Sequence, residues 1–216
     1  MKNKIISLQN IKGGSGKTTL TALLCQYLHD NGIPVMAIDA DIQRSLYNHR
    51  MRELKENPKS EIPWQLEHLD TSDSEYVKAI IEKVKRIDAC IVIDTPGNLN
   101  DPGLLPIFRS IDIAITPFIY DSDNLDATQM FAQTIKKISK AKMFFVPNRI
   151  SEIEERREEI QQARDNAKSI LGKYGMLTAR IKSSVVVKCY STLQPLTYYQ
   201  RNAVKYAFEP ILNLIK

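Results

Sequence analysis

The sequence predicts an α/β fold with a doubly wound, mostly parallel sheet and helices on both faces. Strand-like apolar segments alternate with helix-like segments along the chain, which is the pattern of a parallel sheet. The run 89–93 is continuously apolar, as in a central strand that helices cover on both faces. A chain of 216 residues can bury one sizeable core, so we expect residues 1–216 to form a single domain.

The first predicted strand and helix flank a glycine-rich loop, residues 12–19. Residues 4–8 are apolar and β-prone, whereas residues 20–28 place apolar side chains at helical spacing. Glycines let a loop curl tightly, and its N–H groups, together with the helix N-terminus, attract phosphate. We therefore predict a P-loop, as in P-loop NTPases, with a ligand-free turn as the alternative. Its nucleotide-binding residues would be Gly13, Gly14, Ser15, Gly16, Lys17, Thr18 and Thr19.

Lys17 and Thr18 of this loop have expected partners in a bound nucleotide and its metal ion. Lys17 would reach the β- and γ-phosphates, and the Thr18 hydroxyl would ligate Mg²⁺. The first helix should end at 30–32, where Gly32 suits the left-handed C-terminal position. The cofactors predicted by this loop are a nucleoside triphosphate and magnesium.

Carboxylates follow two of the predicted strands. Strand 35–38 leads into Asp39 and Asp41, and strand 89–93 leads into Asp94. In open α/β sheets, ligands bind at the carboxyl ends of the strands. We expect Asp94 to hold magnesium through water, and Gly97 to let the following loop respond to the γ-phosphate. For Asp39 and Asp41 the alternative is capping of the next helix.

The remaining elements are predicted with their boundary signals. A charged helix covers 44–56 and an edge strand 61–69; the capping box Ser72-x-x-Glu75 opens a helix to about 86. Strand 111–117, a helix through 140 and strand 143–146 follow. Ser151-x-x-Glu154 opens another helix with a Glu152–Arg156 pair on its solvated face, and Pro210 starts a short apolar helix.

The cysteine spacing, the hydrophobicity and the charge distribution limit the functional classes to which the protein can belong. The three cysteines are far apart and form no C-x-x-C pair, so neither a disulfide framework nor a zinc or iron–sulfur site is expected. Without an 18-residue apolar run or a signal-peptide pattern, a cytoplasmic protein is expected. The net charge of +5 lies entirely in residues 180–216, which hold six basic residues and one acidic residue.

The loop Lys12-Gly-Gly-Ser-Gly-Lys-Thr-Thr19 departs from the usual P-loop, because Ile11 stands where the first glycine should be. It resembles the deviant Walker A motif of the ParA/MinD family of ATPases. In that family the first lysine crosses an ATP-bound dimer interface to the partner's phosphates, which implies this role for Lys12. By the same resemblance, Asp41 would position or activate the attacking water and Asp39 would support the magnesium shell. Ile42 replaces the family's usual proline.

The resemblance also assigns residues beyond the P-loop. The strand-end Asn148 resembles the family's adenine-reading residue, with Arg149 beside it in the nucleotide site. In the ParA branch, basic residues towards the C-terminus bind DNA without sequence preference. This implies a DNA-binding role, with a solvated basic face as the alternative, for Arg180, Lys182, Lys188, Arg201 and Lys205.

A short ParA-type partition ATPase is the function that the resemblance favours. Such a protein binds ATP and Mg²⁺, closes into a homodimer and coats nonspecific DNA on the nucleoid. A ParB-like protein bound to the cargo then stimulates slow hydrolysis, without any membrane. The alternatives are a MinD-like membrane-cycling ATPase, which the nearly uncharged C-terminal segment 209–216 disfavours, and a metabolic member of the same fold.

Overall fold

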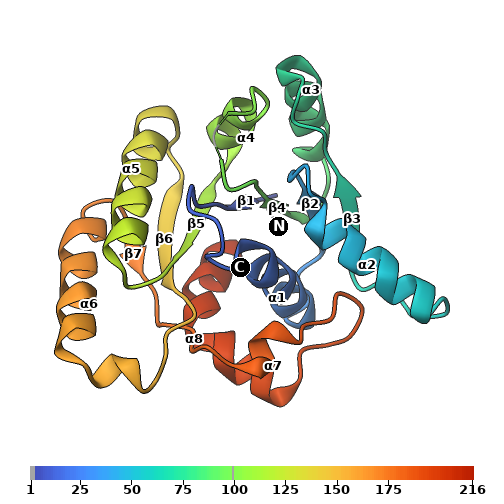
Figure 1. The fold of residues 1–216 in the computed structure, drawn as a ribbon. Helices are drawn as coiled ribbons and strands as arrows, with labels where there is room; N and C mark the ends of the chain where they lie inside the picture. The colour runs from blue at the N-terminus through green and yellow to red at the C-terminus, as the bar shows by residue number, and fades with distance from the viewer. Residues whose placement is uncertain (1–2, 99) are drawn as a thin grey trace.

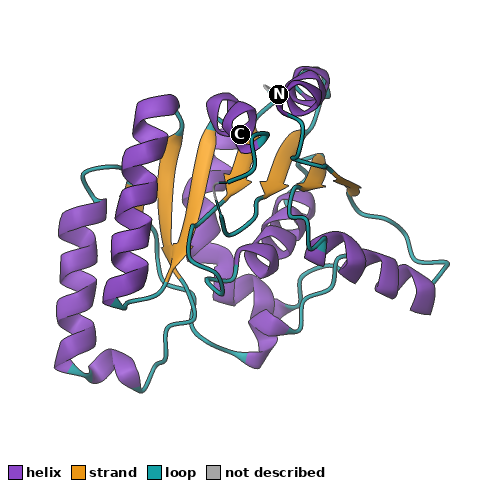
Figure 2. Cartoon of the chain, turned by 45° about the horizontal axis from the view of Figure 1, so that its top comes forward, coloured by secondary structure: helices purple, strands orange, loops and turns teal. Residues whose placement is uncertain are grey.

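A computed structural model describes residues 3–98 and 100–216, and in these residues seven strands form one sheet (Figures 1 and 2). All neighbouring strands are parallel, in the order β3-β2-β4-β1-β5-β6-β7. The strands are β1 (Ile5–Leu8), β2 (Val35–Asp39), β3 (Gln65–His68), β4 (Cys90–Asp94), β5 (Ile113–Phe118), β6 (Lys142–Pro147) and β7 (Met176–Leu177). The predicted doubly wound α/β fold is confirmed, and β3 is an edge strand as expected.

Helices cover both faces of this sheet (Figure 1). They are α1 (Lys17–Asp30), α2 (Ser45–Glu56), α3 (Ser74–Val84), α4 (Leu104–Ser110), α5 (Ser122–Ile138), α6 (Glu158–Leu171), α7 (Val185–Lys188) and α8 (Tyr198–Ile215). A 3₁₀ turn, η1 (Glu154–Arg156), precedes α6. Among the described helices, none has the length and hydrophobicity of a transmembrane span.

Two hydrophobic clusters, one on each face, explain why the central strands are continuously apolar. Ile6 and Leu8 of β1 pack with α1 and α8, where Phe208 is fully buried. Ile5 of the same strand belongs to the opposite cluster, which includes Phe131 of α5. Burying a side chain of this size contributes about 1.5–3 kcal/mol, so β1 is held from both sides.

Strand register brings two acidic strand ends together beside the P-loop. Asp94 of β4 is paired with Asp39 of β2 on one side and with Leu8 of β1 on the other. The chain leaves β1 at Leu8 and continues into the glycine-rich loop before α1. The sheet therefore places both carboxylates at the edge where the loop lies.

Helix boundaries agree with some predicted signals and contradict others. Helix α1 ends at Asp30 and Gly32 has φ +77°, as predicted. The capping box at Ser72 is wrong, because α3 begins later and Asp73 accepts from the N–H groups of Glu75 and Tyr76. Helices α3 and α5 each end two residues before their predicted ends.

The predicted helix start at Ser151 and the Glu152–Arg156 pair are also wrong. Helix α6 starts only at Glu158, after the 3₁₀ turn. Glu152 instead bonds Lys182, with 2.8 Å between the carboxylate and ammonium. A long-range ion pair therefore replaces the predicted local one.

Pro210 does not start a helix but lies inside α8, which begins at Thr197 with a capping box to Gln200. A proline inside a helix removes the bond to the carbonyl four residues before it, here that of Tyr206. Tyr206 is exposed, so water can satisfy this carbonyl. The long helix therefore tolerates the proline on its outer side.

A buried arginine ties α2 to the segment before α8. Arg50 donates through Nε to the Thr192 hydroxyl at 2.7 Å and through Nη2 to the Thr192 carbonyl at 2.8 Å. Its guanidinium also lies 4.1 Å from the Trp64 ring centroid. Glu53 of α2 accepts from the Thr192 N–H at 2.8 Å. These bonds join parts of the chain that are 142 residues apart.

Candidate active site

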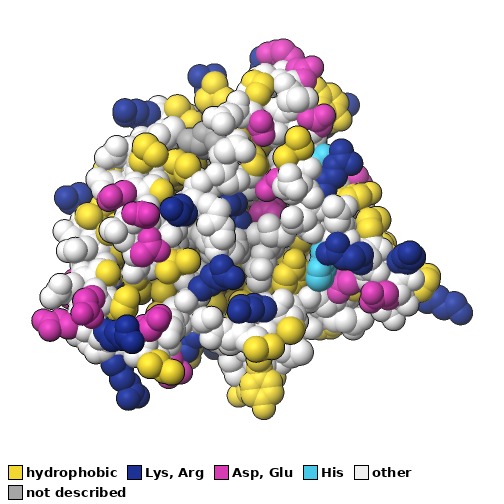
Figure 3. Space-filling view, viewed as in Figure 1, with side chains coloured by type: hydrophobic (Ala, Val, Ile, Leu, Met, Phe, Trp, Pro, Cys, Tyr) yellow, Lys and Arg dark blue, Asp and Glu magenta, His cyan; other side chains and the backbone are white. Residues whose placement is uncertain are grey.

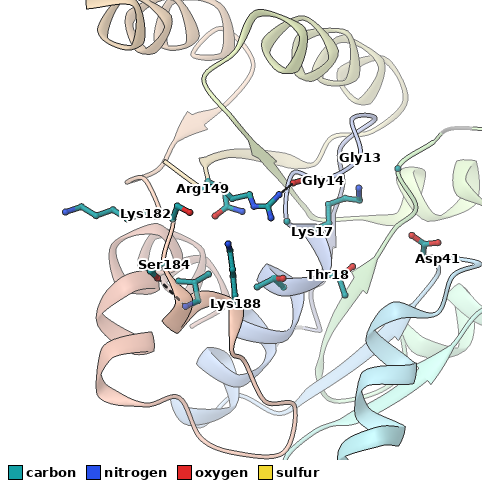
Figure 4. A pocket seen from close by; sticks show the side chains of 15 residues that line it. Gly13, Gly14, Lys17, Thr18, Asp41, Arg149, Lys182, Ser184 and Lys188 are labelled. Carbon is teal, nitrogen blue, oxygen red and sulfur yellow. Dashed lines mark hydrogen bonds between the residues drawn. The ribbon is translucent and has the colours of Figure 1, made fainter. Parts of the chain in front are cut away.

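A cavity of about 340 Å³ opens at the carboxyl edge of the sheet, between the P-loop and α7 (Figure 4). One wall comes from the loop and the start of α1, and the other from the end of β6 and the segment 182–188. Its lining residues are Gly13, Gly14, Gly16, Lys17, Thr18, Thr19, Asp41, Gly97, Asn148, Arg149, Lys182, Ser183, Ser184, Val187 and Lys188. The structure thus brings most of the predicted nucleotide-binding residues together.

Two local features shape the P-loop. Asn10, just before it, donates to the Pro117 carbonyl at 2.7 Å and accepts from the Lys12 N–H at 3.0 Å. Gly16 precedes α1 with φ +92°, and a Cβ there would lie 2.4 Å from Nδ2 of Asn148. Glycine is therefore required at this position for both conformation and space.

The Lys17 ammonium lies at the base of this loop. Its Nζ donates to the Asn10 carbonyl at 3.3 Å, and a Cβ at Gly97 would lie 3.5 Å from it. Burial lowers the pKa of Lys17, and the charges of Asp94 and Asp41 oppose that shift. The Lys17 ammonium is thus a cation close to carboxylates, in a position to bind the phosphates that the sequence predicts.

Asp94 is buried at the end of β4. Burial raises the pKa of the Asp94 carboxyl to about 7, although hydrogen bonds from Thr18 and Thr21 lower it. The Thr21 hydroxyl lies 3.1 Å from Oδ1, whereas Oδ2 has no hydrogen-bond partner among the described residues. Carboxylate and hydroxyl oxygens suit Mg²⁺, and a bound cation would favour the ionised carboxylate. The residues present therefore fit magnesium.

The other two carboxylates differ in their surroundings. Asp39 is fully buried, and its two oxygens accept from the N–H groups of Asp41 at 3.1 Å and Tyr47 at 2.9 Å. Asp41 lines the cavity, half-buried, and accepts from the Gln43 N–H at 2.9 Å. Asp39 does not belong to the lining, and its contacts match the capping alternative. Ile42 is 76% exposed.

Lys12 is exposed and does not line the cavity of its own chain, although Gly13 and Gly14 do. Its Nζ lies 3.7 Å from an oxygen of Asp123, at the start of α5. Both side chains are largely solvent-accessible, so this ion pair contributes little to stability. Within its own chain, the Lys12 ammonium lies beside Asp123 of α5.

The end of β6 contacts the P-loop directly. Asn148 is buried and donates from Nδ2 to the Ser15 carbonyl at 2.8 Å, while Oδ1 has no partner among the described residues. Arg149 has φ +59° and donates to the Gly14 carbonyl at 2.5 Å. The amide therefore supports the P-loop and leaves one buried acceptor, Oδ1, without a partner among the described residues.

The five basic residues predicted to bind DNA lie in different settings. Arg180 bonds Glu155, Lys182 bonds Glu152, and Arg201 bonds the carboxylate of Asp30 at 2.7 Å. Lys205 is exposed beside Tyr206, and Lys188 lines the cavity. Figure 3 shows basic side chains gathered near the middle of the face that contains α7. Four of the five, Arg180, Lys182, Lys188 and Lys205, are exposed, and Arg201 is half-buried.

Some site residues escaped the sequence reasoning. Thr21 follows Lys17 by four residues on α1, and this spacing on an amphipathic helix could have identified it. No comparable signal marks Asn10 or Ser184. Their positions depend on strands and turns that are distant in sequence.

Comparison with known proteins identifies the family. Residues 6–185 match the profile described as the CobQ/CobB/MinD/ParA nucleotide binding domain. The chain belongs to this family. Its members are nucleotide-binding ATPases, so the predicted resemblance to the ParA/MinD ATPases is confirmed.

Solved structures with the same fold include two ParA-type proteins. A putative plasmid partition protein from Borrelia burgdorferi, bound to AMPPNP, aligns with a TM-score of 0.75 and 20% identity, over 99% of this chain and 100% of that one. The pNOB8 ParA bound to nonspecific DNA aligns with a TM-score of 0.64 and 14% identity, over 98% and 99% of the two chains. At these identities the likeness shows the fold.

One curated relative matches over a short segment. A putative replication protein A from Rhizobium rhizogenes is 58% identical over 43 residues, which are 20% of this chain and 11% of that protein. The aligned part thus spans about a tenth of this relative's length.

Proposed function

We propose that this protein is a ParA-like ATPase that binds ATP and Mg²⁺, dimerises, and binds nonspecific DNA to position a plasmid, chromosome or other cargo. A ParB-like protein on the cargo would stimulate slow hydrolysis and release the dimer from DNA. The dimer acts in the cytoplasm, on the nucleoid. The position of Lys12 carries this proposal: the family's signature lysine stands outside its own cavity and is exposed.

Within this proposal each residue has a chemical role. Lys17 and the P-loop N–H groups hold the β- and γ-phosphates, and Asp41 orients the attacking water from the opposite side of the cavity. Thr18 and Asp94 hold Mg²⁺, which neutralises charge on the phosphates when bound. Lys12 of each protomer adds positive charge at its partner's phosphates, as an arginine finger does elsewhere.

The hydrogen bonds of Asn148 support its proposed base-reading role. Because Nδ2 donates to the Ser15 carbonyl, the unpartnered Oδ1 is the atom left for the nucleotide. An acceptor at this point suits the exocyclic amine of adenine and disfavours the carbonyl oxygen of guanine. Arg149 holds the loop at Gly14 beside it.

The proposed DNA contacts use the exposed side chains of Arg180, Lys182 and Lys205. They also use Arg201, which is half-buried against Asp30. Exposed ion pairs are weak, so Lys182 can exchange Glu152 for a phosphate, whereas Arg180 is held by the half-buried Glu155. Such contacts give salt-dependent binding, and each neutralised phosphate adds about 0.9 to the slope of log K against log salt.

The decisive experiment measures dimerisation and DNA binding with ADP, with ATP, and with ATP for Lys12→Ala, over a salt series. We expect ATP-dependent dimers that bind DNA in a salt-sensitive way, and loss of both in Lys12→Ala with ATP affinity retained. Lys78→Ala on α3, exposed and paired with Glu75, is the charge-matched control. DNA binding without ATP, or full dimerisation of Lys12→Ala, would contradict the proposal.

A further inference from the structure

Lys188, the last residue of α7, has an exposed side chain that lies at the mouth of the nucleotide cavity. Its side chain lines the wall opposite the P-loop, and Figure 4 shows its tip directed towards Arg149. The sequence grouped Lys188 with the DNA-binding candidates because it lies in the basic C-terminal segment. Its position calls for a different role.

The backbone on both sides of Lys188 is fixed by hydrogen bonds. Before α7, the Ser183 N–H donates to the Ile150 carbonyl at 2.9 Å, and Ser184 caps the helix through the Val187 N–H. From α8, Nε2 of Gln200 donates to the carbonyls of Val186 and Cys189. Lys188 is thus presented to the cavity by a short helix anchored to both β6 and α8.

The other cations of the cavity are already engaged. Lys17 bonds the Asn10 carbonyl, Arg149 bonds the Gly14 carbonyl, and Lys182 bonds Glu152. Figure 4 shows Lys182 extending away from the cavity. For Lys188, by contrast, no ion pair or side-chain hydrogen bond is formed within residues 3–98 and 100–216. Lys188 is therefore available to a ligand of the cavity.

The chemistry of that ligand follows from the two facing walls. Thr18 and Thr19 stand at the N-terminus of α1, where N–H groups and the helix dipole favour phosphate. The carboxylate that lines the cavity, Asp41, lies apart from Lys188 in Figure 4, on the far side of Thr18. A ligand in the cavity would therefore have the N-terminus of α1 on one side and the Lys188 ammonium on the other. Both groups favour an anionic ligand.

We propose that Lys188 binds the α- or β-phosphate of the nucleotide from the α7 wall, and that it takes no part in DNA binding. This inference rests on the proposed nucleotide site and adds a residue to it. A charge-assisted hydrogen bond of this kind strengthens nucleotide binding about tenfold or more. Because α7 is bonded to α8, the contact also joins the nucleotide to the C-terminal segment.

The first test compares the dissociation constants of ATP and ADP for the wild type and Lys188→Ala. We expect both constants to rise about tenfold, with substantial recovery in Lys188→Arg. Lys205→Ala, which removes an exposed lysine of the same segment outside the cavity, should leave both constants unchanged. Equal affinities in Lys188→Ala and wild type would overturn the inference, and so would weakening of ATP alone, which indicates a γ-phosphate contact.

The second test measures DNA binding with ATP at a saturating concentration for each variant. Lys188→Ala should then bind DNA with the wild-type affinity and salt slope, while Lys205→Ala binds more weakly. Weaker DNA binding by ATP-saturated Lys188→Ala would overturn the inference. A wild type that binds no nucleotide would refute the proposed function itself, whereas unchanged nucleotide binding in Lys188→Ala refutes only the role of this lysine.

Discussion

Asp39 and Asp94 are chemically identical residues in register on neighbouring strands, yet their surroundings differ. Both oxygens of Asp39 accept backbone N–H groups of the loop and helix that follow β2. Asp94 accepts the Thr21 hydroxyl at one oxygen and leaves the other without a partner among the described residues. A buried carboxylate with both oxygens bonded to the backbone supports structure, whereas one with an unpartnered oxygen can accept a ligand.

The pKa of both carboxyls is shifted in the same direction, so this direction alone does not distinguish Asp39 from Asp94. Burial raises the pKa of both, but backbone N–H groups oppose the shift at Asp39, and hydroxyl groups and the Lys17 charge oppose it at Asp94. The hydrogen-bond partners, more than burial, therefore distinguish the two roles. Isosteric amide substitutions can test this distinction.

The largest effect is expected for Asp94→Asn. A neutral amide holds magnesium more weakly, so we expect the Mg²⁺ affinity of the nucleotide complex to fall about 10- to 100-fold. Titration of ATP hydrolysis and of ATP binding with Mg²⁺ measures this change. Urea denaturation of the nucleotide-free protein should show no loss of stability, because the unpartnered charge has been removed. An unchanged Mg²⁺ dependence would remove Asp94 from the metal site.

Asp39→Asn should show the opposite behaviour. An amide accepts only through its neutral oxygen, so the N–H of either Asp41 or Tyr47 loses its acceptor and faces the NH₂ group, while the other keeps only an uncharged acceptor. We expect the free energy of unfolding to fall by about 1–3 kcal/mol, measured by urea denaturation. The Mg²⁺ affinity should stay close to that of the wild type. A loss of Mg²⁺ affinity as large as in Asp94→Asn would show that Asp39 supports the magnesium shell.

The smallest effect is expected for Thr21→Val. This change removes the hydroxyl bonded to Asp94 and keeps the shape of the side chain, so about 1 kcal/mol of support for the carboxylate is lost. Mg²⁺ titration should show a shift of a few-fold. Thr134→Val is the matched control, because its hydroxyl also bonds the carbonyl four residues earlier but lies on the exposed part of α5. Equal effects of the two variants would contradict a role for Thr21 at Asp94.

Much of the fold could be predicted from the sequence because its signals are local. Alternating strands and helices, the apolar run before Asp94 and the glycine-rich loop each mark their own element. The family follows from the same loop. The carboxyl-edge position of Asp41 and Asp94 then follows from parallel strand geometry alone.

The errors arose where distant residues compete with a local signal. Ser72 was a plausible cap, but Asp73 bonds the same N–H groups and sets the helix start one residue later. Glu152 bonds Lys182, 30 residues away, and not Arg156. Lys188 was grouped by sequence position, whereas bonds from Ile150 and Gln200 place it at the nucleotide cavity. None of these contacts has a periodicity that a sequence pattern could reveal.

The hydrogen bonds between Arg50 and Thr192 also bear on when this part of the domain can fold during synthesis of the chain. The ribosome completes α2 and β3 long before Thr192 emerges, so the guanidinium can at first bond only the Trp64 carbonyl and gains its two bonds to Thr192 from the last part of the protein. A buried arginine without its partners destabilises a fold by several kcal/mol. The α2 corner of the nascent domain therefore closes only near the end of translation, and a chain that stops before Thr192 keeps this charge solvated and this corner open.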